Sequence, residues 1–315
     1  MTVPGVPLHP QFDHAVLIHD DDAALVSATR RFVARGLDAG GDVLVHSDRS
    51  RVAALKAELG SDPRLSFGCD EEMYGAPAET LFAYQRQLAS RGPDARELWV
   101  TGTVPLGATT ATRAAWVRYE SAVNEALGSF PFHALCTYDA RTTPPAVLAA
   151  ARATHPVLDT GLDQVPSREY RAPADFLADP LAQVRQAPRA APLLTTRLAE
   201  LDDLAALRSL IRTAGRAASA VSFDAVEDLI HAVYEVAANG LMHGAPPVSV
   251  KLWASLAEMV VEVVDAGPGG LDPLAGYRLP DALGAMGLWA ARLEVDDLVI
   301  DCPDGGGCRV LVFKS

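Results

Sequence analysis

The sequence predicts two domains of different fold class, an α/β domain followed by an α+β domain. Short apolar runs alternate with helical patterns in the first half, whereas helical patterns precede a series of strands in the last third. A proline-rich segment separates the two regions. We therefore assign residues 1–160 to the first domain, 161–194 to a linker and 195–315 to the second domain.

Composition favours a soluble protein with two buried cores. Of the 315 residues, 49% are hydrophobic and 21% are charged. The net charge of −13 argues against a sequence-independent nucleic-acid surface, which needs a basic footprint. The N-terminus lacks the basic region and apolar core of a signal peptide, and no apolar run reaches the roughly 18 residues of a membrane span. We expect a cytoplasmic protein that binds neither nucleic acid nor membrane.

The cysteine pattern predicts reduced thiols. The four cysteines are scattered and form no C-x-x-C pair. Cys302 and Cys308 flank a glycine-rich turn and could face each other across a hairpin, but we interpret them as two ordinary strand cysteines.

The first domain contains five short apolar runs that predict a parallel sheet. Near-continuous apolar strands alternating with helices are typical of sheets covered on both faces. The predicted strands are 14–19, 42–46, 65–67, 98–101 and 133–138, and the predicted helices cover 25–37, 52–59, 79–91 and 116–127. Ligands of such sheets bind beyond the carboxyl ends of the strands. The polar residues there are His19, Asp20, His46, Ser47, Cys69, Thr101, Thr103, Tyr138 and Asp139.

The first strand is followed by acidic residues where a nucleotide-binding loop would lie. Asp20-Asp21-Asp22 replaces the G-x-x-x-x-G-K-[ST] pattern, and three carboxylates would repel a phosphate. The first domain is therefore not predicted to be a P-loop ATPase. His14 and His19 are five apart on a strand and face opposite sides, and the sequence shows no tight His/Cys cluster. A metal or haem site is the less favoured alternative.

Four segments of this domain resemble a known sensory family. They are His14-Ala-Val-Leu-Ile-His-Asp20, Trp116-Val-Arg118-Tyr119-Glu120 with Asn124, Cys136-Thr-Tyr138-Asp139 and Thr154-His155-Pro156. Over roughly residues 12–160 the sequence resembles the MEDS domain of bacterial and archaeal regulators. The resemblance implies a RecA/KaiC-like fold that lacks a P-loop. It also implies that the domain responds to a signal, which is a small organic compound or another unidentified small molecule or protein.

The sequence of the second domain predicts helices followed by antiparallel strands. Leucines from Leu198 to Leu210 recur about every three residues and predict a helix that ends at Gly215. A second helix is predicted over 223–242 and a third over 283–293. The predicted strands are 247–253, 257–265, 298–302 and 309–313, the last two forming a hairpin. This order favours an α+β sandwich with helices on one face.

One polar stripe and two glycine-rich loops in this domain indicate a nucleotide site. Glu235, Asn239 and His243 are spaced at i, i+4 and i+8 of the second helix. The first loop holds Asp265, Gly267 and Gly269, and the second holds Gly284, Gly287 and Leu288. Asn239 can supply the neutral oxygen ligand that a phosphate-bound Mg²⁺ takes from protein. Glu235 can orient or deprotonate an attacking hydroxyl, and glycines let backbone approach a ligand closely.

These three motifs resemble the boxes of the GHKL (Bergerat) ATP-binding fold. Glu235-x-x-x-Asn239 resembles its N box, Asp265-x-Gly267-x-Gly269 its first glycine box, and Gly284-x-x-Gly287-Leu288 its second. The resemblance covers about residues 195–315 and implies ATP and Mg²⁺ as cofactors. It also implies that Asp265 binds adenine, that Gly284 and Gly287 lie near the phosphates, and that Glu235 is the catalytic base.

Within that fold, the short spacing between the boxes is similar to the spacing in one subgroup, the RsbW-like anti-sigma-factor serine kinases. This resemblance implies two partners, a sigma factor and a STAS-domain anti-anti-sigma protein phosphorylated on serine. It also places a partner-contacting arginine at Arg208 and raises homodimer formation as an alternative to a monomer. Ala285-Met286 departs from the pattern, because a basic residue is common there.

Together the resemblances imply a sensor-regulated anti-sigma factor with ATP-dependent serine/threonine kinase activity. One alternative is a nucleotide-gated binding module without catalysis. Another is an orphan histidine kinase acting on a separate phosphoacceptor protein. The linker shows no helical hairpin carrying a phosphoacceptor histidine, which favours a serine of another protein as the acceptor.

Overall fold

The computed structural model describes residues 12–69, 74–92, 94–107, 109–179, 186–218, 221–279, 286–302 and 306–315. The chain divides into two compact units, residues 1–176 and 177–315. The division falls inside the segment 161–194 that the sequence analysis assigned to a linker. Each unit is described by itself below.

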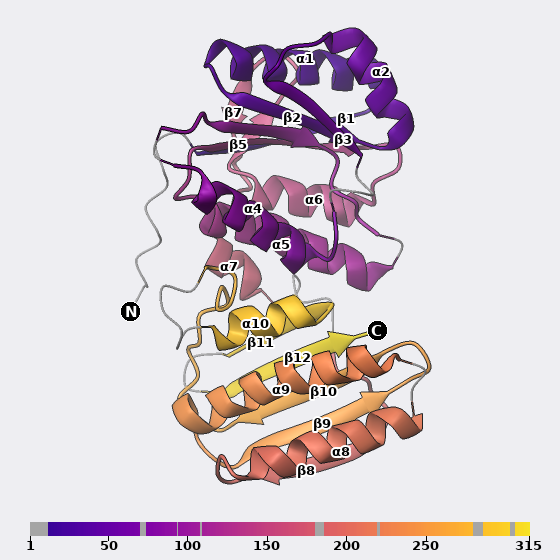
Figure 1. The fold of residues 1–315 in the computed structure, drawn as a ribbon, viewed down its shortest axis with the longest axis vertical. Helices are drawn as coiled ribbons and strands as arrows, with labels where there is room; N and C mark the ends of the chain where they lie inside the picture. The colour runs from indigo at the N-terminus through magenta and orange to yellow at the C-terminus, as the bar shows by residue number, and fades with distance from the viewer. Residues whose placement is uncertain are drawn as a thin grey trace. The chain divides into compact units, whose positions relative to one another are not determined.

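The first unit is built on a mostly parallel sheet, as predicted (Figure 1). Its strand order is β3-β2-β4-β5-β1-β6-β7, and every neighbouring pair is parallel except β6 with β7. The strands are β1 (Asp13–His19), β2 (Asp42–Ser47), β3 (Leu65–Cys69), β4 (Leu98–Gly102), β5 (Phe132–Asp139), β6 (Val157–Asp159) and β7 (Gln164–Pro166). The five predicted strands are all present, and β6 and β7 extend the sheet beyond them.

Helices cover both faces of this sheet, which explains its near-continuous apolar strands (Figure 1). They are α1 (Asp22–Asp38), α2 (Arg49–Leu59), α4 (Pro77–Ser90), α5 (Thr110–Ala126) and α6 (Pro145–Thr154). Ala15 and Leu17 of β1 pack in a core with α1 and α2, whereas Val16 packs with residues of α6. Alternate residues of β1 therefore reach opposite faces, and His14 shares the face of Val16.

The predicted linker, 161–194, and the residues just before it contain more regular structure than expected. β6 pairs in parallel with Ala15–Leu17 of β1, and β7 folds back on β6. A short helix, α7 (Pro173–Leu177), follows. The sequence analysis missed β6 and β7 because each has only three residues, too few for a periodic pattern.

The second unit has a fully antiparallel sheet of order β11-β12-β10-β9-β8. Its strands are β8 (Leu194–Leu198), β9 (Val248–Ala254), β10 (Met259–Asp265), β11 (Asp297–Asp301) and β12 (Cys308–Lys314). Its helices are α8 (Asp203–Ala218), α9 (Phe223–His243) and α10 (Gly287–Glu294). Residues of all three helices share one core with alternate residues of the sheet, so the helices lie on one face, as predicted (Figure 1).

The start and end of helix α8 differ from the prediction. Leu198 belongs to strand β8, and Leu201 is half exposed before the helix begins at Asp203. The leucine periodicity therefore spans the end of strand β8, a turn and the start of helix α8. Gly215 does not end the helix but lies inside it. A side chain there would meet the Met259 Cε atom at 2.8 Å, so this glycine allows close packing on β10.

The opposite face of the second sheet carries a smaller apolar cluster. Val260, Val299, Leu311 and Phe313 alternate with the residues that face the helices and pack around Trp253. The Trp253 indole donates a hydrogen bond to the Ala190 carbonyl at 2.8 Å, which ties part of the predicted linker to this face. Among the described residues of the chain, we find no helix with the length and hydropathy needed to cross a membrane.

Helix α9 provides a test of the core of the second unit. Leu229 of α9 is fully buried in the main core, whereas Leu256 in the β9–β10 turn is 82% exposed. We expect Leu229→Ala to lower the free energy of unfolding by about 2–5 kcal/mol, because it removes buried surface and leaves a cavity. Leu256→Ala is the matched control and should change it by less than about 0.5 kcal/mol. Urea unfolding measures both, and equal effects would contradict the assigned core.

Candidate functional site

Helix α9 carries the predicted polar stripe beside the main core. Ser222 caps its start by accepting a hydrogen bond from the Ala225 backbone at 3.2 Å. Val233 and Ala237 are fully buried against the sheet, whereas Glu235 and Asn239 are half-buried on another face of the helix. His243 is exposed at the last position of α9. The spacing seen in the sequence thus brings these side chains onto one side of the helix.

Asp265 ends strand β10 and lies directly against α9. Its Oδ1 accepts a hydrogen bond from the Gly267 backbone at 2.7 Å, which closes the turn after the strand. A side chain at Gly244 would meet the Asp265 carboxyl at 2.5 Å, and one at Gly240 would meet Asp265 Cβ at 3.6 Å. These two glycines of the α9 end therefore allow helix and strand to approach closely.

A cavity of about 470 Å³ opens between α9, the end of β10 and the start of α10. We refer to it as the α9 cavity. Asn239, Asp265, Gly269, Gly287 and Leu288 all line it, so residues from the three predicted motifs meet at one place. Its other lining residues are Val236, Gly240, His243, Gly244, Val263, Pro268, Gly270, Leu271, Ala275, Gly276, Cys308 and Val310. Its volume lies in the range of small-molecule sites.

Two more predicted residues lie next to this cavity. The turn of Gly267 packs on Gly244, where an added side chain would meet the Gly244 Cα at 2.8 Å. Glu235 lies near the first residue of α10, because a side chain at Gly287 would meet Glu235 Oε2 at 2.6 Å and Asn239 Nδ2 at 3.8 Å. Gly284, the remaining predicted residue, lies outside the described residues, as does Ala285.

The α9 cavity has few charges to oppose a phosphate. Among its lining residues in the described part of the chain, none is lysine or arginine. The groups suited to anions are the backbone N–H groups at the start of α10 and the imidazole of His243. A polyphosphate there would need a bound cation to balance its charge.

Cys302 and Cys308 form a disulfide across the β11–β12 connection. The prediction that these two were ordinary strand cysteines, and reduced, is therefore wrong in this structure. The antiparallel pairing of β11 with β12 brings the two cysteines together, as the glycine-rich turn between them allowed. Cys308 also lines the α9 cavity, whereas Cys69 and Cys136 are free thiols.

Arg208, the predicted partner contact, lies on helix α8 and interacts within its own unit. Its guanidinium carbon is 4.3 Å from the ring centre of Tyr234 on α9. This cation–π contact links the two helices.

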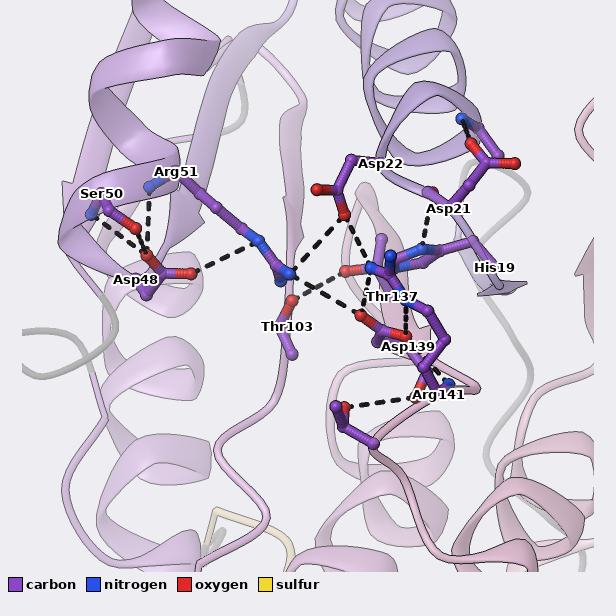
Figure 2. A network of polar contacts seen from close by, with 12 residues as sticks. His19, Asp21, Asp22, Asp48, Ser50, Arg51, Thr103, Thr137, Asp139 and Arg141 are labelled. Atoms are coloured by element: carbon purple, nitrogen blue, oxygen red, sulfur yellow. Dashed lines mark hydrogen bonds and ion pairs between the residues drawn. The ribbon is translucent and has the colours of Figure 1, made fainter.

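In the first unit, a charged network occupies the carboxyl ends of the parallel strands (Figure 2). The Arg141 guanidinium donates to both carboxylate oxygens of Asp139, at 2.8 and 2.6 Å, and to Asp22 at 2.7 Å. Arg51 reaches from α2 toward Asp139 and Asp22, at 3.7 and 3.8 Å. Figure 2 also shows Thr137, whose hydroxyl is 3.0 Å from that of Thr103.

This network pairs Asp22 of the acidic segment with Arg51 and Arg141, where a phosphate loop would lie. Asp21 caps α1 by accepting a hydrogen bond from the Ala24 backbone at 2.6 Å, so a carboxylate takes the place of an anionic ligand. The hydrogen bond from Arg141 holds the pKa of Asp139 well below its ordinary value. His19 is held by the Asp21 carbonyl, 3.0 Å from its Nδ1.

A second polar cluster lies buried between the same sheet and the helices α5 and α6. It consists of His14 on β1, Glu120 on α5, Cys136 on β5 and His155 after α6, and we call it the buried cluster. One ligand-type atom from each residue lies within 4.8 Å of the others. The prediction that no His/Cys cluster exists is therefore wrong. The four residues are far apart in sequence. They come together because β1 pairs with β5 and because α5 packs against the sheet.

The carboxylate of Glu120 is the centre of the buried cluster. Its Oε2 lies 3.2 Å from His14 Nε2 and 3.3 Å from His155 Nε2, and Tyr138 donates to its Oε1 at 3.0 Å. Burial works to raise the pKa of Glu120, but His14 and His155 in their protonated forms outweigh it by hydrogen bonding and charge, and they hold the pKa below its ordinary value. Burial and the charge of Glu120 raise the pKa of the Cys136 thiol.

Comparison with known families identifies the first domain. The family model MEDS, described as the methanogen/methylotroph, DcmR sensory domain, matches residues 13–156. The predicted MEDS domain is therefore confirmed, and this part of the chain is a sensory domain. All four members of the buried cluster lie within the matched residues.

The remaining comparisons add little about the second domain. The histidine kinase domain of the blue-light activated histidine kinase from Erythrobacter litoralis EL346 matches with 16% identity. The match covers 76% of this chain and 91% of that one, with a TM-score of 0.22, which is too low to relate the two folds. No curated protein matches the sequence.

Replacing Arg141 should remove a stabilising contribution that depends on pH. Because the folded-state pKa of Asp139 lies below its unfolded value of about 3.9, the pair stabilises the folded chain above that pH. The contribution is lost as pH falls through the folded-state pKa. We expect Arg141→Gln to lower the free energy of unfolding near neutral pH, and the difference from wild type to shrink below about pH 4. Urea unfolding over a pH series measures this.

Arg30→Gln is the matched control, because its ion pair with Glu58 is more than half exposed on both sides. It should change stability little at any pH. If the effect of Arg141→Gln stayed constant through the acid range, the Asp139 pair would not be the source of the pH dependence.

Proposed function

We propose that the second domain has the GHKL-type ATP-binding fold and that the chain is a sensor-regulated protein kinase. It would bind Mg²⁺-ATP in the α9 cavity and transfer the terminal phosphoryl group to a serine or threonine of another protein. The observation that carries the proposal is the meeting of Asn239, Asp265, Gly269 and Gly287 around one cavity of suitable size. The MEDS domain would supply the signal that regulates this activity.

Asp265 is the group proposed to select adenine. Its Oδ1 is used by the turn, through the Gly267 backbone, so Oδ2 is the oxygen proposed to accept a hydrogen bond from the adenine amine. The cavity walls near it are apolar, including Val263, Leu271 and Val310, which suits the faces of a base. A buried acceptor discriminates strongly against a base that lacks the matching donor.

Asn239 and the start of α10 are proposed to hold the phosphates. The Asn239 carboxamide lies near Gly287, where backbone N–H groups begin helix α10. Because no lysine or arginine lines the described part of the cavity, Mg²⁺ would supply most of the positive charge. We therefore propose that nucleotide binding depends strictly on Mg²⁺, with Asn239 as the protein ligand.

Glu235 is proposed as the catalytic base. It lies one helical turn before Asn239 and approaches the same first residue of α10, so base and metal ligand lie together. A carboxylate there can accept the proton of an incoming hydroxyl as the phosphoryl group is transferred. Catalysis would then rest on positioning and on Mg²⁺ rather than on covalent chemistry.

The acceptor is proposed to lie on a separate protein. No histidine occurs between His155 and His231, so the segment before the second domain offers no phosphoacceptor histidine. By its resemblance to the anti-sigma-factor kinases, the domain would bind a sigma factor and phosphorylate a serine on a STAS-domain partner. The chain would then release or capture the sigma factor according to the signal at the MEDS domain.

One observation favours a second candidate, a nucleotide-gated binding module without catalysis. The cavity lining lacks a cationic side chain in the described residues, and such a group commonly stabilises charge during phosphoryl transfer. In that case ATP would bind and change partner affinity, but no phosphorylated product would form.

Two substitutions separate nucleotide binding from catalysis. We expect Asp265→Asn to raise the dissociation constant for ATP at least about tenfold, because it replaces a charged acceptor by an amide. Glu235→Ala should leave ATP affinity nearly unchanged but lower phosphotransfer by about 10²–10⁴-fold. Calorimetric titration with Mg²⁺-ATP and detection of acid-stable phosphoserine on the partner measure the two effects.

Asp301→Asn serves as the control, since Asp301 also ends a strand of this sheet but is paired with Arg309 outside the cavity lining. It should alter neither quantity. Unchanged ATP affinity in Asp265→Asn would refute the proposed nucleotide site. Full phosphotransfer by Glu235→Ala would refute only the catalytic assignment, and binding without any product would favour the non-catalytic module.

A further inference from the structure

We propose that the buried cluster of His14, Glu120, Cys136 and His155 binds one divalent first-row transition-metal ion. The site would lie inside the sensory domain, on the face of the parallel sheet that α5 and α6 cover. His14, Glu120 and His155 are at most 2% exposed, so water does not solvate their polar atoms. The inference is independent of the nucleotide site proposed above.

Four of the six distances among the ligand atoms match those of a tetrahedral ion, and the other two are within 4.8 Å. With zinc bonds of about 2.0 Å to nitrogen or oxygen and about 2.3 Å to sulfur, a tetrahedral site separates nitrogen from oxygen by about 3.3 Å and sulfur from either by about 3.5 Å. The Glu120 Oε2 atom lies 3.2 Å from His14 Nε2 and 3.3 Å from His155 Nε2. The Cys136 Sγ atom lies 3.6 Å from both His14 Nε2 and Glu120 Oε2.

Hydrogen bonds on the outer side of each imidazole fix the nitrogen that faces the cluster. The Asn124 amide nitrogen donates to three backbone carbonyls, including that of Thr154 at 2.7 Å. Its Oδ1 is therefore the acceptor for His14 Nδ1–H, at 3.1 Å. His155 Nδ1–H donates to the Ala151 carbonyl at 2.7 Å. Both rings thus direct Nε2 inward, the arrangement by which outer hydrogen bonds orient metal-binding histidines.

Without an ion, these inward atoms are poorly matched. In each neutral ring Nε2 is an acceptor, yet it faces the Glu120 carboxylate, which is also an acceptor. His155 Nε2 is fully buried and has no hydrogen-bond partner of normal geometry. Charging His14 alone would pair it with Glu120 but would leave His155 Nε2 unmatched. Charging both rings would place two cations side by side, since their ring centres are only 4.0 Å apart. An ion at the centre would satisfy all three groups at once.

The donor set also balances the charge of a divalent ion. A carboxylate and a thiolate contribute two negative charges, and two neutral imidazoles contribute none, so the complex would be neutral. Neutrality matters because an uncompensated charge in this interior would be costly. Imidazole, thiolate and carboxylate together suit zinc or ferrous iron rather than Mg²⁺ or Ca²⁺, which prefer oxygen ligands alone.

A small cavity adjoins the cluster and would give the ion a further coordination position. Its volume is about 30 Å³, and His14, Glu120 and Cys136 line it together with Tyr74 and Tyr119. Such a space admits one or two waters or a molecule of similar size. Metal binding would thus place a Lewis-acidic centre beside a small-ligand pocket in the sensory domain.

The test uses the full-length chain and the metals themselves. Elemental analysis of protein purified without added metal should find close to one zinc or iron per chain. After stripping with a chelator, Co²⁺ should bind with one-to-one stoichiometry and give an intense sulfur-to-cobalt charge-transfer band together with the visible bands of a tetrahedral ion. Zinc should then displace the cobalt. Absence of tight Co²⁺ and Zn²⁺ binding by the stripped, folded protein would overturn the proposal.

Matched cysteine variants assign the band to the cluster. Cys136→Ser should abolish the charge-transfer band, whereas Cys69→Ser, which changes the other free thiol of the same sheet, should leave it intact. Retention of the band in Cys136→Ser would overturn the proposal, as would its loss in Cys69→Ser alone. If Cys136→Ser fails to fold, as judged by circular dichroism, His155→Gln provides the second variant and should lower cobalt affinity by about 10-fold or more. An unchanged affinity in that variant would contradict the assignment.

Discussion

The close approach of helix α9 to strand β10 sets the geometry of the second domain. Gly240 and Gly244 have no side chains, so the end of the helix rests against Val248 and the Asp265 carboxyl. The main core holds the other side of α9, where Leu229 and Val233 are fully buried. A helix fixed on both sides gives the half-buried Glu235 and Asn239 a rigid support. The proposed nucleotide site depends on this constraint.

The first domain places charged side chains in two different surroundings around its parallel sheet. At the carboxyl ends of the strands, carboxylates are exposed enough to pair with arginines, as Asp139 does with Arg141. On the face that α5 and α6 cover, two histidines and a tyrosine contact the Glu120 carboxylate instead. The first arrangement engages the arginines at the sheet end with carboxylates. The second creates a polar pocket in which an ion would be stabilised.

Local patterns predicted most elements, and long-range pairing explains what they missed. Alternating or continuous apolar residues identified the strands of both sheets except β6, β7 and β8, and the i, i+4 spacing placed Glu235 and Asn239 on one stripe. Local patterns could not predict the buried cluster, because its members come from four separate elements, β1, α5, β5 and the end of α6. The disulfide likewise depends on the β11–β12 register. Gly215 was misjudged because helix-ending and close-packing glycines look alike in sequence.

A structure of the chain with Mg²⁺ and a non-hydrolysable ATP analogue tests the central claim most directly. We predict that the adenine amine donates to Asp265 and that the Asn239 carboxamide oxygen binds Mg²⁺, with the phosphates at the start of α10. Binding of the analogue at another place, or an empty α9 cavity at saturating analogue, would contradict the account of the second domain.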